Sequence, residues 1–161
     1  MSVVADAAPA ARADAPPWTR MGMAVLALAG LLISSYLLLH RLGFVGTLAC
    51  GAGGCDTVQA SPWAVFLGVP VPAWGVGGYA AILAAALLGL QPRWLAARWV
   101  AGALFALAAV AFAFSAYLTA LEAFVIRAWC RWCLGSAAIS TALFALALAE
   151  LPRIRGAEGR R

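Results

Sequence analysis

Four long apolar runs constrain this chain more than any other feature of its sequence. They cover about Met21–Leu39, Ala73–Leu90, Trp99–Leu121 and Cys133–Leu151. Each run is long enough for a helix that crosses a bilayer, which needs roughly 17–25 residues. Apolar residues make up 65% of the chain and charged residues only 11%, against roughly 45–50% and 25% in soluble domains. So few charges could not cover a soluble surface, and we expect an all-α integral membrane protein with a bundle of four transmembrane helices.

The connection between the first two runs, His40–Val71, is long and of mixed character. It contains a glycine-rich stretch, Cys50–Cys55, and then a semi-apolar segment, residues 61–68, which is too short to span a bilayer. That segment fits a short helix lying at the membrane interface, with Trp63 at the depth of the lipid headgroups. We therefore expect a long loop that carries a short interfacial helix.

The arginines predict how the helices are oriented. All 11 basic residues are arginines, and they lie near the ends of the apolar runs. Eight belong to the two tails and the second connection, and three to the first and third connections. Because arginine gathers on the cytoplasmic side, both termini are predicted to be cytoplasmic and the long loop to lie on the outer face. The eight are Arg12, Arg20, Arg93, Arg98, Arg153, Arg155, Arg160 and Arg161, and the three are Arg41, Arg127 and Arg131.

This orientation divides the chain into three parts. Residues 1–20 are predicted to be a disordered cytoplasmic tail, residues 21–151 the four-helix membrane domain, and residues 152–161 a basic cytoplasmic tail. The net charge of +5 does not indicate a nucleic-acid partner, because arginines scattered at the ends of apolar runs are typical of a protein whose partner is the lipid bilayer.

The four cysteines form two close pairs near the ends of the apolar runs, Cys50 with Cys55 and Cys130 with Cys133. Both pairs then lie on the outer face, where disulfides form and persist. The spacing of Cys130 and Cys133 places both sulfurs on one side of the first turn of the fourth helix. The free N–H groups and the helix dipole there stabilise a thiolate, and such thiols exchange readily. A disulfide closing so small a loop indicates catalysis rather than stabilisation.

The loop between Cys50 and Cys55 contains Gly51, Gly53 and Gly54. Glycine lets this loop bend, as a relay between two redox partners requires. Two other interpretations stay open, a structural disulfide and a zinc site made of four thiolates. Structural zinc sites usually lie in small polar domains, so no metal ligand is predicted. No histidine follows the second pair, which excludes covalent attachment of a c-type haem.

A longer pattern surrounds these cysteines, and it resembles the bacterial homologues of vitamin K epoxide reductase over roughly residues 20–150. A combination of motifs at both ends of the match is more specific than either half alone. The pattern is Cys50-x4-Cys55-Asp56-x-Val58-x2-Ser61-x-Trp63, then Gly68-x-Pro70 and Gly75, and later Tyr117-Leu-Thr-x-Leu-Glu122 and Trp129-Cys-x-Trp-Cys133.

The resemblance implies a four-helix bundle around a membrane quinone, ubiquinone or menaquinone. It implies that Cys130 and Cys133 form the active-site pair, with Cys133 nearer the quinone, and that Ser61 lies near the quinone pocket. Cys50 and Cys55 would carry electrons from a thioredoxin-like protein. Many bacterial members carry a fused thioredoxin-like domain. This chain is expected to lack one, and a separate periplasmic or extracellular DsbA-like protein is expected as its partner.

We therefore expect a thiol–quinone oxidoreductase of the bacterial inner membrane that supports disulfide bond formation. The hydroxyls of Tyr79 and Tyr117 are further candidates for contacts with the quinone. Glu122 is expected to be solvated, and Trp129 and Trp132 to belong to an interfacial belt.

Two alternative functions remain at this stage. One is the DsbB type of enzyme, whose C-x-x-C lies in the first outer loop rather than before the last helix. The other is a membrane protein that handles a soft metal ion through thiolates.

Overall fold

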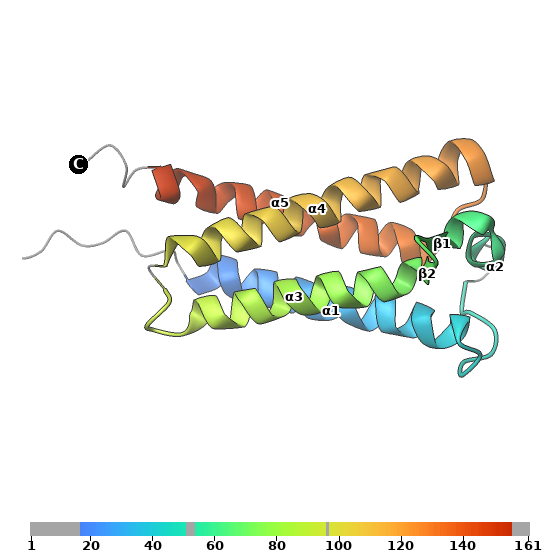
Figure 1. The fold of residues 1–161 in the computed structure, drawn as a ribbon, viewed down its shortest axis with the longest axis horizontal. Helices are drawn as coiled ribbons and strands as arrows, with labels where there is room; N and C mark the ends of the chain where they lie inside the picture. The colour runs from blue at the N-terminus through green and yellow to red at the C-terminus, as the bar shows by residue number, and fades with distance from the viewer. Residues whose placement is uncertain (1–16, 51–53, 96, 156–161) are drawn as a thin grey trace, which may run out of the picture.

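Four long helices form the structure, which is a computed structural model describing residues 17–50, 54–95 and 97–155. All four are long and apolar enough to cross a membrane, which confirms the predicted four-helix membrane bundle. They run alternately up and down (Figure 1), so that the start of α1 and the end of α5 lie at the same end of the bundle. The helices are α1 (Pro17–Arg41), α3 (Val71–Leu90), α4 (Arg98–Ala120) and α5 (Arg131–Arg155).

Small side chains let the helices pack closely. α1 packs mainly against α3 and α5, and α4 packs against α5 and α3. The middle of the bundle is a cluster of buried residues in which Ala27, Ala86 and Ala108 alternate with larger side chains such as Ile82. Gly30 of α1 faces the Tyr79 ring so closely that a Cβ would lie 2.4 Å from a ring carbon. Small residues at such contacts are typical of membrane helix packing.

A buried ion pair joins three helices at the end of the bundle where α1 begins. Arg20 donates from Nε to Glu150 at 3.4 Å and from its guanidinium to the carbonyl of Gly89 at 2.6 Å. The sequence predicts Arg20 as part of the N-terminal tail, but α1 begins at Pro17, since proline is favoured in the first turn of a helix. Arg20 is therefore a packed part of the bundle, only 3% exposed.

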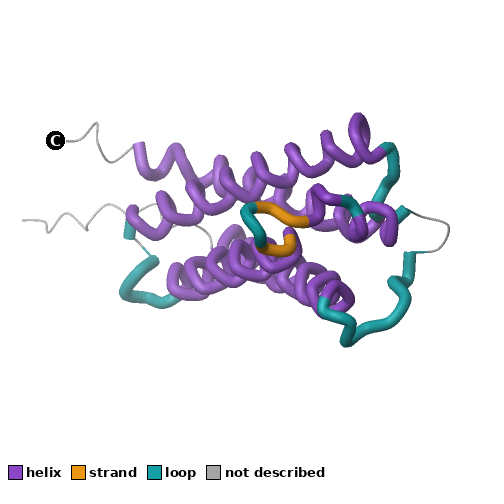
Figure 2. The backbone as a smooth tube through the Cα atoms, turned by 45° about the vertical axis from the view of Figure 1, so that its right-hand side comes forward, coloured by secondary structure: helices purple, strands orange, loops and turns teal. Residues whose placement is uncertain are grey.

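The described part of the loop between α1 and α3 contains more regular secondary structure than the single short helix that was predicted. It contains the short helix α2 (Cys55–Ala60), one 3₁₀ turn (Pro62–Ala64) and the antiparallel strands β1 (Val65–Phe66) and β2 (Val69–Pro70). The short helix therefore lies earlier than residues 61–68, which form the 3₁₀ turn and most of the hairpin. Positive φ angles at Leu67 and Gly68 build the two-residue turn, and they exclude a helix there. Figure 2 shows the two strands against the helices.

The helix that contains Glu122 is longer than predicted. α4 is continued by a π-helical segment, Leu121–Ile126, and the helical path ends at Arg127, which has a φ of 54°. The connection to α5 therefore begins at Arg127 rather than at Glu122. Because π-helical turns alter the direction of side chains, this extension decides where Glu122 points.

Candidate active site

The two cysteine pairs lie together at one end of the bundle, which we call the cysteine end. Cys50, Cys55 and Cys130 are buried in a single packed cluster, and Cys133 packs against it. This cluster forms where α1 ends and α5 begins, so the fold joins residues that are about 80 positions apart in the sequence. The four cysteines singled out in the sequence therefore lie together in one packed cluster.

Cys50 and Cys55 form a disulfide whose Cα atoms are 6.2 Å apart. Because this bond occupies both sulfurs, a zinc site made of four thiolates does not exist in this state. Gly54, immediately before Cys55, packs against the chain that leads to Cys130. A Cβ at Gly54 would lie 2.7 Å from the Cβ of Ala128. Gly54 is thus required for close approach, whereas Gly51 and Gly53 lie outside the described residues.

Side chains from several segments hold this loop in place. Arg41, at the end of α1, donates a hydrogen bond of 2.5 Å to the carbonyl of Gln59 on α2. The hydroxyl of Tyr36 accepts a hydrogen bond of 3.2 Å from the backbone N–H of Ala49, next to Cys50. The Ser61 hydroxyl donates to the carbonyl of Val58 at 2.7 Å. The loop disulfide is therefore anchored on both sides.

Cys130 caps the N-terminus of α5. Its carbonyl accepts the first helical hydrogen bond, from Leu134 at 2.9 Å, and its sulfur accepts the backbone N–H of Cys133 at 3.3 Å. The pKa of the Cys130 thiol is lowered, chiefly by a hydrogen bond from the Cys133 thiol and further by backbone N–H groups, while burial and Glu122 oppose this. The sequence predicts that both thiols of this pair ionise readily, and the structure favours Cys130 as the one disposed to be a thiolate.

Glu122 is buried rather than solvated, which corrects the expectation from the sequence. It is 3% exposed, and its Oε2 accepts the backbone N–H of Cys130 at 3.0 Å. A carboxylate oxygen of Glu122 and the sulfurs of Cys130 and Cys133 all lie within 4.8 Å of one another. The helical extension beyond Ala120 turns Glu122 toward the cysteines, and no periodic sequence signal marked it. Its place at the end of an apolar run and in the pattern Tyr117-Leu-Thr-x-Leu-Glu122 were the available hints.

The Glu122 carboxylate and the thiols of Cys130 and Cys133 are all chemically able to bind a metal ion. Two thiols and one carboxylate are one donor fewer than the four protein ligands of a structural zinc site. Cys50 and Cys55 cannot supply the missing thiolate while they share a disulfide. We assign no metal site to this cluster.

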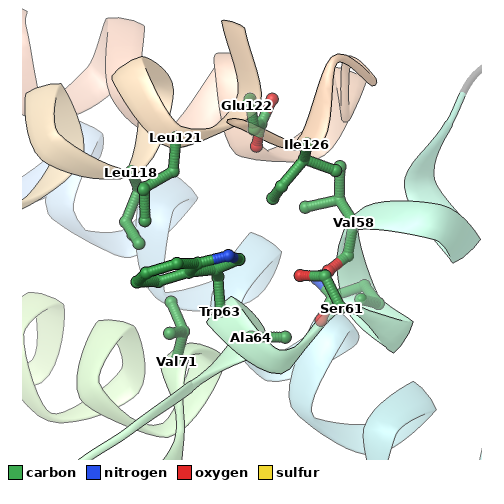
Figure 3. A pocket seen from close by; sticks show the side chains of 10 residues that line it. Val58, Ser61, Trp63, Ala64, Val71, Leu118, Leu121, Glu122 and Ile126 are labelled. Carbon is green, nitrogen blue, oxygen red and sulfur yellow. The ribbon is translucent and has the colours of Figure 1, made fainter. Parts of the chain in front are cut away.

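An apolar pocket adjoins Glu122 at the cysteine end. Figure 3 shows the Trp63 indole between Leu118 of α4 and Val71 of α3, with Glu122 and Ser61 on the same pocket. The only polar side chains in this lining are Gln59, Ser61, Glu122 and the indole N–H of Trp63. A mostly apolar slot with a few polar groups is typical of a small-molecule site.

The structure brings Ser61 to this pocket but not the two tyrosines. Tyr79 is buried between helices, and its hydroxyl is hydrogen-bonded to the carbonyl and hydroxyl oxygens of Ser136, each at 2.8 Å. Tyr117 is 45% exposed on the surface of α4. Neither residue is part of the pocket lining, so contacts between these two hydroxyls and a ligand stay predictions.

Two tryptophans, Trp129 and Trp132, are neighbours in sequence of Cys130 and Cys133, which we call the inner pair. Their environments differ. Trp129 is 51% exposed, as an interfacial residue would be. Trp132 instead packs in the cysteine cluster, with its ring centroid 5.2 Å from that of Tyr36. Its indole N–H is buried and has no hydrogen-bond partner among the residues that the structure describes.

A free thiol pair beside a closed disulfide can react with it by thiol–disulfide exchange. The fold and the site therefore define a class, the multi-pass membrane thiol oxidoreductases. A comparison with known families agrees, because residues 21–148 match the model of the vitamin K epoxide reductase family. The match covers most of the chain, and the protein belongs to the vitamin K epoxide reductase family.

Proposed function

We propose that this protein is a thiol–quinone oxidoreductase that oxidises a thioredoxin-like, DsbA-like partner and passes the electrons to a membrane quinone, ubiquinone or menaquinone. The observation that carries the proposal is the packing of both cysteine pairs in one cluster next to an apolar pocket. Cys50 and Cys55, which we call the loop pair, form a disulfide, whereas the two cysteines of the inner pair are free thiols. That combination is the state in which the inner pair holds two electrons ready for an acceptor.

The electrons follow a chain of two exchanges. A partner dithiol reduces the Cys50–Cys55 disulfide through a mixed disulfide, and the partner leaves with a new disulfide of its own. The loop dithiol then reduces the Cys130–Cys133 disulfide in the same way and is itself re-oxidised. Both loop cysteines are buried, so the loop must open for the first exchange. The net result supports disulfide bond formation in secreted proteins.

The pocket has the chemistry that a quinone head group requires. A quinone bound there would take up two electrons from the reduced Cys130–Cys133 pair together with two protons. Val71, Leu118 and the face of Trp63 provide an apolar slot for a flat ring, and the Ser61 hydroxyl is near enough to orient a ring oxygen once it exchanges its bond to Val58. The sulfurs of Cys130 and Cys133 both lie within 4.8 Å of a carboxylate oxygen of Glu122, which lines the pocket. We propose Cys133 as the sulfur that delivers the electrons.

The cysteine end is proposed to face the outside of a bacterial inner membrane, with both termini in the cytoplasm. The arginine count supports this orientation, as does the stability of disulfides outside the cytoplasm. The partner would act in trans from the periplasmic or extracellular side. A fluorescent protein fused to the C-terminus should fluoresce in cells, and dark fusions would contradict the orientation.

The decisive experiment uses the purified protein in quinone-containing liposomes with a reduced thioredoxin-like protein. Quinone reduction and loss of partner thiols should proceed together and stop completely in Cys133→Ala. The matched control is Leu134→Ala, which alters the next residue of α5 without removing a sulfur and should stay active. If Cys133→Ala reduced quinone at the wild-type rate, the proposal would be wrong. Stoichiometric bound metal with no reversible disulfide would instead support soft-metal handling.

A further inference from the structure

Two acids are buried among the described residues of the bundle, and their surroundings differ. Glu150 is paired with Arg20 at 3.4 Å, which explains its burial. Glu122 is equally buried, at 3% exposure, yet in the part of the chain that is described no basic side chain forms an ion pair with it. A carboxylate buried without a cation is unfavourable, and an ionisable residue within a membrane-spanning segment is by default a candidate for function.

The contacts of Glu122 connect the sulfurs to the pocket. Its carboxylate accepts the backbone N–H of Cys130 at 3.0 Å, and one of its oxygens lies within 4.8 Å of the sulfurs of both Cys130 and Cys133. Two groups that can accept the proton of the Cys133 thiol, the Cys130 sulfur and the Glu122 carboxylate, therefore lie within 4.8 Å of its sulfur. The same side chain lines the pocket together with Ser61 and Trp63 (Figure 3).

We infer that Glu122 is the proton acceptor of the inner cysteine pair, taking the proton of the Cys133 thiol and releasing it on the pocket side. This inference rests on the proposed function. In the reaction, the two S–H bonds of the inner pair break, one S–S bond forms and two electrons leave for the quinone. Cys130 releases its proton to water, since its thiol ionises more readily than usual. The Cys133 proton goes to Glu122 and from there to one quinone oxygen, and water supplies the proton for the other.

The other charged groups near the site are poorly placed for this role. Asp56 on α2 has a side chain 74% exposed. Arg127, before Cys130, and Arg131, between Cys130 and Cys133, are also exposed. Arg41 is directed to the carbonyl of Gln59. In the described part of the chain, Glu122 is the one carboxylate grouped with the two sulfurs.

The test is Glu122→Gln, which keeps the size of the side chain and an acceptor for the Cys130 N–H but cannot take up a proton. It is made in a Cys50→Ala, Cys55→Ala background, so that only the inner pair carries thiols. Quinone reduction by the pre-reduced protein should fall about 100-fold, because a positioned proton-transfer group contributes roughly 10²–10⁴-fold. Alkylation of Cys133 by iodoacetamide, measured by mass spectrometry without quinone, should rise several-fold, because no carboxylate then repels the thiolate.

Slower quinone reduction together with faster alkylation of Cys133 distinguishes a proton acceptor from a residue that only supports the structure. The wild-type rate should also fall at acid pH, where the carboxylate is already protonated, and E122Q should lack this acid limb. Asp56→Asn, which removes an exposed carboxylate from the same end, should leave both readouts unchanged, and Glu122→Asp should keep more of the rate than E122Q. Unchanged quinone reduction in E122Q, equal losses in E122Q and E122D, or a fall in both readouts would overturn the inference. If the wild-type protein itself reduced no quinone, the proposed function would fail instead.

Discussion

Replacing Gly54 with alanine tests whether the contact between the loop and the chain before Cys130 serves the relay. A Cβ at Gly54 would lie 2.7 Å from the Cβ of Ala128. That is about 1 Å less than the ~3.5–4.0 Å at which two carbon atoms pack best. The backbone of Gly54 has a φ of −77°, on the side that alanine also adopts. The steric contact, rather than backbone strain, therefore decides the effect.

The magnitude follows from the displacement that the methyl group requires. Moving the loop by about 1 Å separates Cys55 from the inner pair, and a misplacement of this size can cost on the order of 10²-fold in rate. The cost to stability is smaller, about 1–3 kcal/mol for overpacking. Gly54→Ala should therefore fold with its Cys50–Cys55 disulfide intact and transfer electrons between the pairs about 10–100-fold more slowly.

Rapid quenching measures this transfer directly. The fully oxidised protein is mixed with reduced partner, quenched with a thiol-alkylating reagent, and analysed by mass spectrometry for the pair that holds the thiols. Gly46→Ala is the matched control, because a Cβ at Gly46 in the same loop has no neighbour within 4 Å. Transfer at the wild-type rate in Gly54→Ala, or an equal loss in Gly46→Ala, would refute the reasoning.

Three further predictions concern the bundle and the inner pair. Arg20→Met should lower the free energy of unfolding by about 3–5 kcal/mol, because it leaves the buried Glu150 unpaired. Arg20→Met with Glu150→Leu should recover most of that loss in denaturant titrations, and an equal loss in both proteins would contradict the pairing. Tyr79→Phe should cost about 1 kcal/mol of stability by removing its hydrogen bonds to α5 but leave quinone reduction near wild type, whereas strong loss of activity would assign Tyr79 to the pocket. Because the pKa of Cys130 is lowered, its thiolate persists below the ordinary pKa of a thiol and is lost only as the pH falls through the lowered value. Exchange with a small disulfide should therefore reach half its maximal rate at lower pH in the wild type than in Cys133→Ala, and equal midpoints would argue against the hydrogen bond from Cys133.

The membrane bundle and the cysteine pairs were predictable because their signals are local. An apolar run of some 20 residues has few structural alternatives. The C-x-x-C before the last run places its sulfurs on one helical turn whatever the rest of the chain does. The position of the loop helix was less predictable, because the stretch from Pro62 to Pro70 is short and has turn residues at both ends. In the structure Gly68 has a positive φ, and this stretch forms a hairpin instead of the helix.

The burial of polar groups could not be predicted from the sequence, because it depends on contacts between distant segments. Arg20 looked like a tail arginine until the fold placed Glu150 and Gly89 against it. Glu122 looked like a solvated acid at the end of a helix. It is buried because the π-helical continuation of α4 directs it to the backbone N–H of Cys130. A resemblance at the level of motifs named the cysteines and Ser61 but gave no role to this carboxylate.

The central claim is that the inner pair reduces the quinone, and one stoichiometric measurement tests it most directly. A Cys50→Ala, Cys55→Ala variant, fully reduced and mixed without oxygen with excess quinone in a bilayer, holds only the thiols of Cys130 and Cys133. We expect one quinol per protein molecule, formed together with a Cys130–Cys133 disulfide that mass spectrometry can locate. Free thiols after complete mixing, or quinol formed without that disulfide, would contradict the account.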